Sequence, residues 1–128
     1  MWSDKYYYLN LYKNEELSFV YDTKELRDFI NRIPELYSVN NYEFTNTESF
    51  PFTQLLLLNV ESLNNWTKSE THPEKTNLIT IVCGKGEQID FNELKGVFIK
   101  IASYLKWNLV EEETDEGIEN YIIWKPEE

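Results

Sequence analysis

Residues 90–105 read DFNELKGVFIKIASYL, and this stretch decides much of the fold. Asp90 can accept hydrogen bonds from the free amides of a first helical turn, and Glu93, three residues later, completes a capping box. Gly96 costs about 1 kcal/mol relative to alanine inside a helix, and we expect a close approach to a sheet to offset that cost. Large apolar side chains recur at helical spacing, at Leu94, Val97, Phe98, Ile101 and Leu105. The stretch therefore predicts a helix that buries one side against a sheet.

An earlier stretch repeats this pattern. Asp22 and Glu25 are spaced as a capping box, and Pro34 disfavours continuation of a helix beyond it. Between them, apolar residues fall on one stripe at Leu26, Phe29, Ile30 and Ile33. The sequence thus predicts two amphipathic helices, far apart along the chain.

Several stretches around these helices have the composition of strands. They are residues 6–13, 17–21, 37–45, 52–60, 78–83, 107–113 and 118–125. The first two are joined by a polar turn and predict a hairpin; the last two are joined through Gly117, which can adopt a positive φ, and predict another. Residues 52–60 and 78–83 are the richest in branched apolar side chains, so we expect them at the centre of the sheet.

Helices this few and this unevenly spaced do not fit a doubly wound parallel sheet. The pattern predicts the α+β class, with a mainly antiparallel sheet of about six or seven strands and two helices packed on one face. The expected element order is ββα-βββ-αββ. A chain of 128 residues has the usual size of one domain, and we expect residues 1–128 to form it.

Charge narrows the range of partners. The chain has 23 acidic and 12 basic side chains, a formal charge of -11, of which residues 111–128 contribute -7. Such a surface repels phosphate backbones and anionic lipid, so we expect neither nucleic acid nor a membrane as partner. The start MWSDKYYY lacks the basic and apolar regions of a secretory signal, and a single cysteine cannot form an internal disulfide. Both features predict a cytoplasmic protein.

No residue cluster predicts a catalytic centre, and we expect no cofactor and no metal. Gly84-Lys85-Gly86 lacks the spacing of a phosphate-binding loop, so a tight turn is expected there. His72, the single histidine, lies in the polar segment 61–77, which is longer than most unstructured loops. A general base is the one catalytic role open to it. Cys83 ends an apolar run, and we expect it to be buried and inert.

The acidic end of the chain is the strongest candidate for a binding site. In a strand, Glu111 and Glu113 share one side while Glu112 points the other way, which disfavours a single metal cage. These carboxylates either keep an edge hairpin soluble or attract a basic partner, and aromatic residues could supply the desolvated contacts. The predicted partner-binding residues are Glu111, Glu112, Glu113, Asp115, Glu116, Glu119, Trp66, Tyr6 and Tyr8.

Three functions stay open at this point. The first is a small acidic protein-binding module that masks a basic protein, for example an immunity or antitoxin-like inhibitor of a nuclease toxin; the likeness to such inhibitors is one of composition. The second is a small enzyme that uses a carboxylate and His72 under the 61–77 segment. The third is a self-associating structural or phage-related assembly protein, whose exposed strand aromatics would be Tyr6, Tyr8 and Tyr12.

Overall fold

The computed structural model describes residues 6–48, 50–61, 63, 74–85, 91–114 and 116–126. The helices of this part are α1 (Thr23–Ile30) and α2 (Phe91–Leu105). Its strands are β1 (Tyr6–Tyr12), β2 (Tyr21–Asp22), β3 (Leu36–Asn40), β4 (Glu43–Asn46), β5 (Thr53–Leu58), β6 (Lys75–Thr76), β7 (Leu78–Gly84), β8 (Asn108–Glu113) and β9 (Glu119–Trp124).

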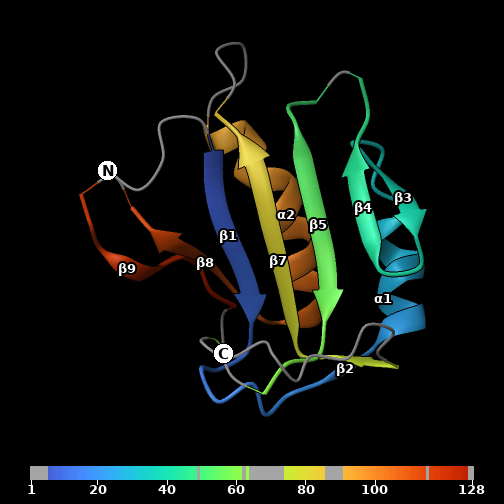
Figure 1. Ribbon diagram of the computed structural model, residues 1–128, viewed down its shortest axis with the longest axis horizontal. Helices are drawn as coiled ribbons and strands as arrows, with labels where there is room; N and C mark the ends of the chain where they lie inside the picture. Colours follow the sequence, from blue (N-terminus) through green and yellow to red (C-terminus); the bar gives the residue numbers. More distant parts are fainter. Residues whose placement is uncertain are drawn as a thin grey trace.

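Seven of the strands form one antiparallel sheet in the order β3-β4-β5-β7-β1-β8-β9, drawn in Figure 1. β7 is central, and β5 and β1 flank it, which confirms the expected position of residues 52–60 and 78–83. β1 pairs with β7 from Tyr6↔Gly84 to Leu11↔Ile79, and with β8 from Leu9↔Glu111 to Tyr12↔Asn108. The short strands β2 and β6 pair separately.

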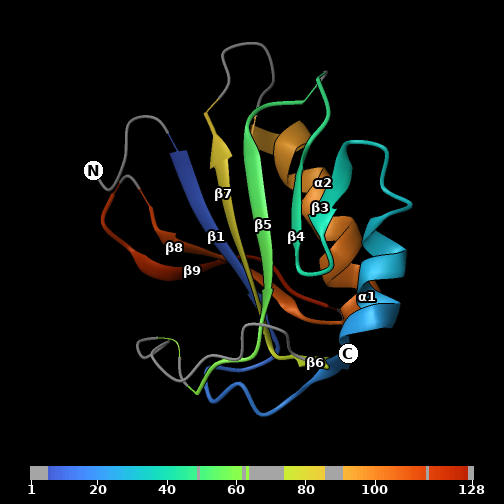
Figure 2. The ribbon, with the colours of Figure 1, turned by 45° about the vertical axis from the view of Figure 1, so that its right-hand side comes forward.

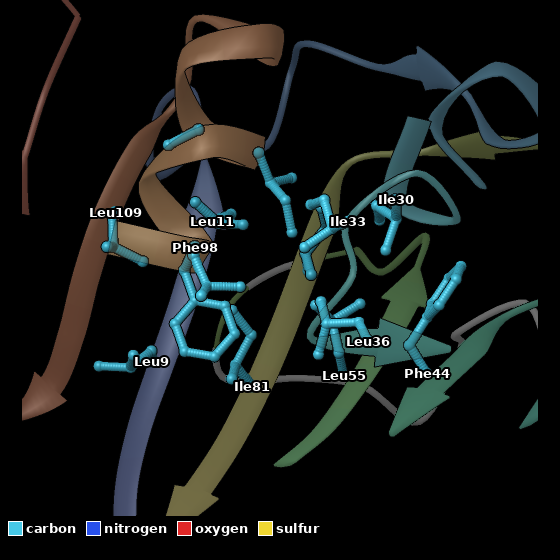
Figure 3. Packing of buried hydrophobic residues seen from close by; sticks show 14 of the residues in the cluster. Leu9, Leu11, Ile30, Ile33, Leu36, Phe44, Leu55, Ile81, Phe98 and Leu109 are labelled. Atoms are coloured by element: carbon cyan, nitrogen blue, oxygen red, sulfur yellow. The ribbon is translucent and has the colours of Figure 1, made fainter. Parts of the chain in front are cut away.

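Both helices lie on the same face of the sheet, where the main core forms (Figures 1 and 2). Leu26 and Ile30 of α1 and Phe98 of α2 are fully buried in this core. They meet the inward side chains of the strands, among them Leu9, Leu11, Phe44, Leu55, Ile81 and Leu109 (Figure 3). An α+β fold with two helices on one face of a mainly antiparallel sheet is therefore confirmed.

A second, smaller core covers one end of the opposite face, which we call the distal face. Its buried members are Tyr12, Leu17, Val60, Leu78 and Val110. Beside them the buried side chain of Asn77 ties two loops together, because its amide donates to the carbonyls of Leu17 (3.3 Å) and Val60 (2.9 Å) and accepts from the amide of Val60 (3.0 Å). The hydrogen bonds of this one side chain therefore hold the two loops together where they are not joined by strand pairing.

The opening hairpin predicted from residues 6–13 and 17–21 is wrong. Leu17 adopts a φ of 55° after a tight turn in which its amide donates to Asn14. The chain then turns away from β1, and Tyr21 pairs with Thr76 in β6 instead. The composition of residues 17–21 indicated an extended segment but not the strand with which it would pair.

Residues 37–45 form a hairpin in place of the one strand that was expected. β3 and β4 pair from Leu36↔Asn46 to Asn40↔Glu43, with a bulge near residue 39. The side chain of Asn40 accepts a hydrogen bond from the amide of Tyr42 (2.8 Å), which supports the reversal of the chain. Asparagine side chains favour this kind of local turn.

The two helices begin at Thr23 and Phe91, each after an aspartate that was predicted to cap it. The carboxylate of Asp22 accepts from the amide of Glu25 (3.0 Å), so the predicted cap of α1 is confirmed. Asp90, the predicted cap of α2, lies outside the described residues.

Gly96 does not make the expected close approach, since a Cβ built there meets no described atom within 4 Å. Neither helix in the described part of the chain has the length and apolar character needed to cross a membrane.

Candidate functional site

The register of the sheet distributes the candidate residues between its two faces. Leu9 pairs with Glu111 and faces the helices, so Tyr8 and Glu112, one residue along each strand, both lie on the distal face. Tyr6 also lies there, opposite Gly84. The structure therefore brings three of the predicted binding residues onto one surface, from β1 and β8.

An aromatic pair marks the end of this surface. Tyr6 and Phe52, both exposed, approach edge to face with ring centroids 5.8 Å apart. They flank Gly84, whose amide donates to the carbonyl of Phe52 (2.7 Å), so no side chain separates the rings. Phe52 was not among the predicted binding residues, because only the pairing of distant strands brings it beside Tyr6.

The predicted acidic patch is divided by the sheet. Glu111 and Glu113 lie half-buried on the side of the helices, and Glu112 lies exposed on the distal face. Glu113 faces Glu119 across the hairpin, so two carboxylates occupy directly opposed positions. Like charges in this arrangement repel each other, and a cation bound between them would relieve the repulsion.

The carboxyl group of Glu112 has a raised pKa. Neighbouring protein atoms reduce its solvation, and the charge of Glu113 adds to the effect. Glu112 therefore takes up a proton at a higher pH than an ordinary glutamate. Contact with a positive group would act in the opposite direction and favour its charged form.

The outer strand β9 and the residue just before it supply exposed apolar side chains close to these carboxylates. Ile118 and Ile122 are 51% and 50% exposed, and Tyr121 is exposed as well. Glu116 and Glu119, both exposed, lie in and just after the turn that leads into β9. We call this group the acidic edge; it consists of Glu112, Glu116, Ile118, Glu119, Tyr121 and Ile122.

The strand aromatics suggested for self-association do not form one exposed row. Tyr12 is 3% exposed, because the second core closes over it. Tyr8 is half-buried, and of the three only Tyr6 counts as exposed. The predicted row of Tyr6, Tyr8 and Tyr12 is therefore wrong at Tyr12, where the chain following β5 returns across the sheet.

Other candidates lie elsewhere or outside the described residues. Trp66, His72 and Asp115 are outside the described part of the chain, so the proposed roles of these residues stay predictions. Cys83 is fully buried, and its pKa is raised to about 12 by burial and by the charge of Glu111. The ammonium of Lys85 lies 5.0 Å from the centre of the Tyr7 ring. Within the described ranges, no group of three or more His, Cys, Asp or Glu side chains could hold a metal ion.

Comparison with known proteins adds no assignment. The chain matches no protein-family model, no curated protein and no solved structure at a significant level.

Proposed function

We propose that this chain is a protein-binding module that masks a basic protein, in the manner of an immunity or antitoxin-like inhibitor of a nuclease toxin. The observation that carries the proposal is the acidic edge, where half-exposed Ile118, just before β9, and Ile122, within β9, lie beside exposed carboxylates at the outer edge of the sheet. Interfaces combine apolar anchors of this kind with a charged rim.

Charge gives the proposed partner its chemistry. The net charge of -11, concentrated after residue 110, attracts a basic surface over a distance of about 10 Å at ordinary ionic strength. The carboxylates of Glu116 and Glu119 then pair with lysine or arginine side chains of the partner, in the positions that nucleic acid phosphates would occupy on a nuclease. Binding of this type inhibits by occupying the partner's active surface.

The apolar anchors provide the second half of the mechanism. β9 lies at the end of the sheet, and an outer strand presents backbone amides and carbonyls to a neighbouring chain. A partner segment that pairs with β9 buries Ile122 and Tyr121 while its basic side chains meet the carboxylates. This geometry gives affinity through the backbone and selectivity through charge.

The test begins with affinity capture of basic proteins by the purified chain, followed by measurement of the association rate with the captured protein at several salt concentrations. The charge variant is E116Q/E119Q, and the matched control is E15Q/E16Q, which removes two exposed carboxylates from a distant turn. We expect salt and the charge variant to slow association, and the control to have a much smaller effect.

The anchor variant is Ile122→Ser, which should speed dissociation and leave the association rate nearly unchanged. An association rate that is independent of salt would contradict the proposed role of charge. Equal losses in E116Q/E119Q and E15Q/E16Q would show that net charge alone, and not the acidic edge, governs binding.

A further inference from the structure

A pocket of about 310 Å³ lies at the start of α1, away from the acidic edge. Its walls come from α1, from the turn between β3 and β4, and from the chain that enters and forms β6. The lining residues carry both signs of charge, since Lys24, Arg27 and Lys75 line the pocket together with Asp22 and Glu74. Tyr42 and Thr23 complete the wall. A volume of this size suits a small molecule.

The backbone holds the two sides of the pocket in fixed positions. β2 pairs with β6 through Asp22↔Lys75, and the amide of Thr23 donates to the carbonyl of Glu74 (3.0 Å). Below this ladder, the hydroxyl groups of Thr23 and Thr76 share a buried hydrogen bond of 2.7 Å. Glu74 is therefore anchored beside the first turn of α1 although it lies 51 residues after Thr23 in the chain.

Two of the five charges are already engaged with each other. The carboxylate of Asp22 caps α1 and lies 3.5 Å from the ammonium of Lys75, and the cap and this cation together lower its pKa. Among the residues that the structure describes, Lys24, Arg27 and Glu74 form no such pair. Arg27 is half-buried. It is also one of only 12 basic side chains in a chain with 23 acidic ones. Two cations and one carboxylate therefore remain available at the pocket.

We propose that this pocket binds a small zwitterionic ligand of the α-amino acid class. Its carboxylate would lie at Lys24 and Arg27, which are three residues apart and therefore neighbours on the surface of α1. Its ammonium would lie at Glu74. A simple anion is repelled by Glu74 and Asp22, and a simple cation is repelled by Arg27 and its neighbours, so the mixed lining favours a ligand with both groups.

Two uncommitted cations against one uncommitted carboxylate match a ligand with a second acidic group. L-glutamate is therefore the probe that we would use, with inorganic phosphate and putrescine as probes that carry one sign of charge. The inference does not depend on the proposed inhibitor function, because the pocket lies by β3 and β4, at the opposite end of the sheet from β9.

The experiment follows backbone amide chemical shifts of the full chain during titration with each probe. L-glutamate should produce saturable shifts at Thr23, Tyr42 and Lys75, and bind more tightly than phosphate or putrescine. Arg27→Gln should weaken glutamate binding roughly tenfold or more, the effect expected for loss of one charge-assisted hydrogen bond. Lys100→Gln, an exposed charge change on α2, should leave it unchanged.

Glu74→Gln gives the sharpest discrimination because its effects on two probes have opposite signs. Glutamate should bind more weakly, since its ammonium loses a partner, and phosphate should bind more tightly, since a repulsive charge is gone. Absence of saturable shifts with glutamate would overturn the proposal. So would equal binding of phosphate and glutamate to the unmodified chain, or glutamate binding that survives both Arg27→Gln and Lys24→Gln.

Discussion

The hydroxyl of Tyr21 donates a 2.7 Å hydrogen bond to the hydroxyl of Tyr104, 83 residues later in the chain. Their rings also meet edge to face, and Tyr104 stacks on Phe29 with ring centroids 3.9 Å apart. These aromatic contacts connect α1, α2 and the short strand β2 at the surface. They account for how two helices that follow different parts of the sheet are held next to each other.

This hydrogen bond raises the pKa of Tyr21 to about 12, with a smaller effect of reduced solvation. Because the unfolded chain releases this proton near its ordinary pKa of about 10, the folded state binds more protons between the two values and its stability falls as pH rises through that range. Tyr104→Phe removes the acceptor, so the pKa of Tyr21 should decrease. Absorbance titration of the tyrosines would detect the change, and Tyr37→Phe, at an exposed site on β3, should remove one tyrosine without moving the others.

Gly96→Ala should stabilise the protein by about 0.5–1 kcal/mol. The residue lies inside α2, and an added Cβ meets nothing within 4 Å, so the gain in helix propensity carries no steric cost. The matched variant is Gly117→Ala, where a φ of +83° should turn the same substitution into a loss. Urea unfolding of both variants measures the difference. Destabilisation by Gly96→Ala would contradict the open space beside this position.

Asn77→Ala should reduce the free energy of unfolding by about 3 kcal/mol, because it leaves three buried backbone groups at Leu17 and Val60 without their partner. Asn59→Ala is the control, since that side chain makes one hydrogen bond, to the carbonyl of Lys75. Its effect should be about 1 kcal/mol or less. Similar losses in the two variants would contradict a special role for Asn77 in closing the second core.

Cys83 should resist thiol reagents in the folded protein. Its side chain is buried, and burial together with the charge of Glu111 raises its pKa to about 12, so little reactive thiolate is present at neutral pH. An aromatic disulfide reagent should label one thiol per chain in denaturant and essentially none without it. Rapid labelling of the native protein would indicate that β7 opens far more readily than its central position in the sheet implies.

Glu112→Gln should change stability and partner binding in opposite directions at neutral pH. Because the pKa of Glu112 is raised on folding, the folded state binds more protons than the unfolded chain, and stability decreases as pH rises through that range. The glutamine variant should therefore be more stable than the unmodified chain at neutral pH, and similar to it at about pH 3, where glutamates are protonated. It should nevertheless bind a basic partner more weakly. A variant with unchanged stability at both pH values would contradict the raised pKa.

Local patterns in the sequence predicted those parts of the fold whose partners lie nearby in the chain. The cap at Asp22, the buried stripe of α2 and the β8–β9 hairpin with Gly117 at positive φ are of this kind. The course of residues 17–22 was missed, because its strand partner β6 lies more than 50 residues away within a polar segment. The residue types at 17–22 favoured an extended chain but carried no information on which strand would pair with it.

The candidate site was likewise predictable where it depends on local sequence and not where it depends on distant strands. Strand alternation correctly separated Glu112 from Glu111 and Glu113, but the proximity of Tyr8 to Glu112 and of Tyr6 to Phe52 depends on strand order. The pocket at α1 was not predicted, since Arg27 and Glu74 share no motif and come to line one pocket only through the β2–β6 pairing.

The position of β1 has a consequence for synthesis of the protein. Residues 6–12 are synthesised well before both of their neighbouring strands, which begin at Leu78 and Asn108. At roughly 5–20 residues per second, several seconds pass before either is made, and during that time Leu9 and Leu11 have no sheet to enter. The nascent chain thus carries an unsatisfied apolar strand at least until β7 has been synthesised, and the sheet forms only when segments far apart in the sequence meet.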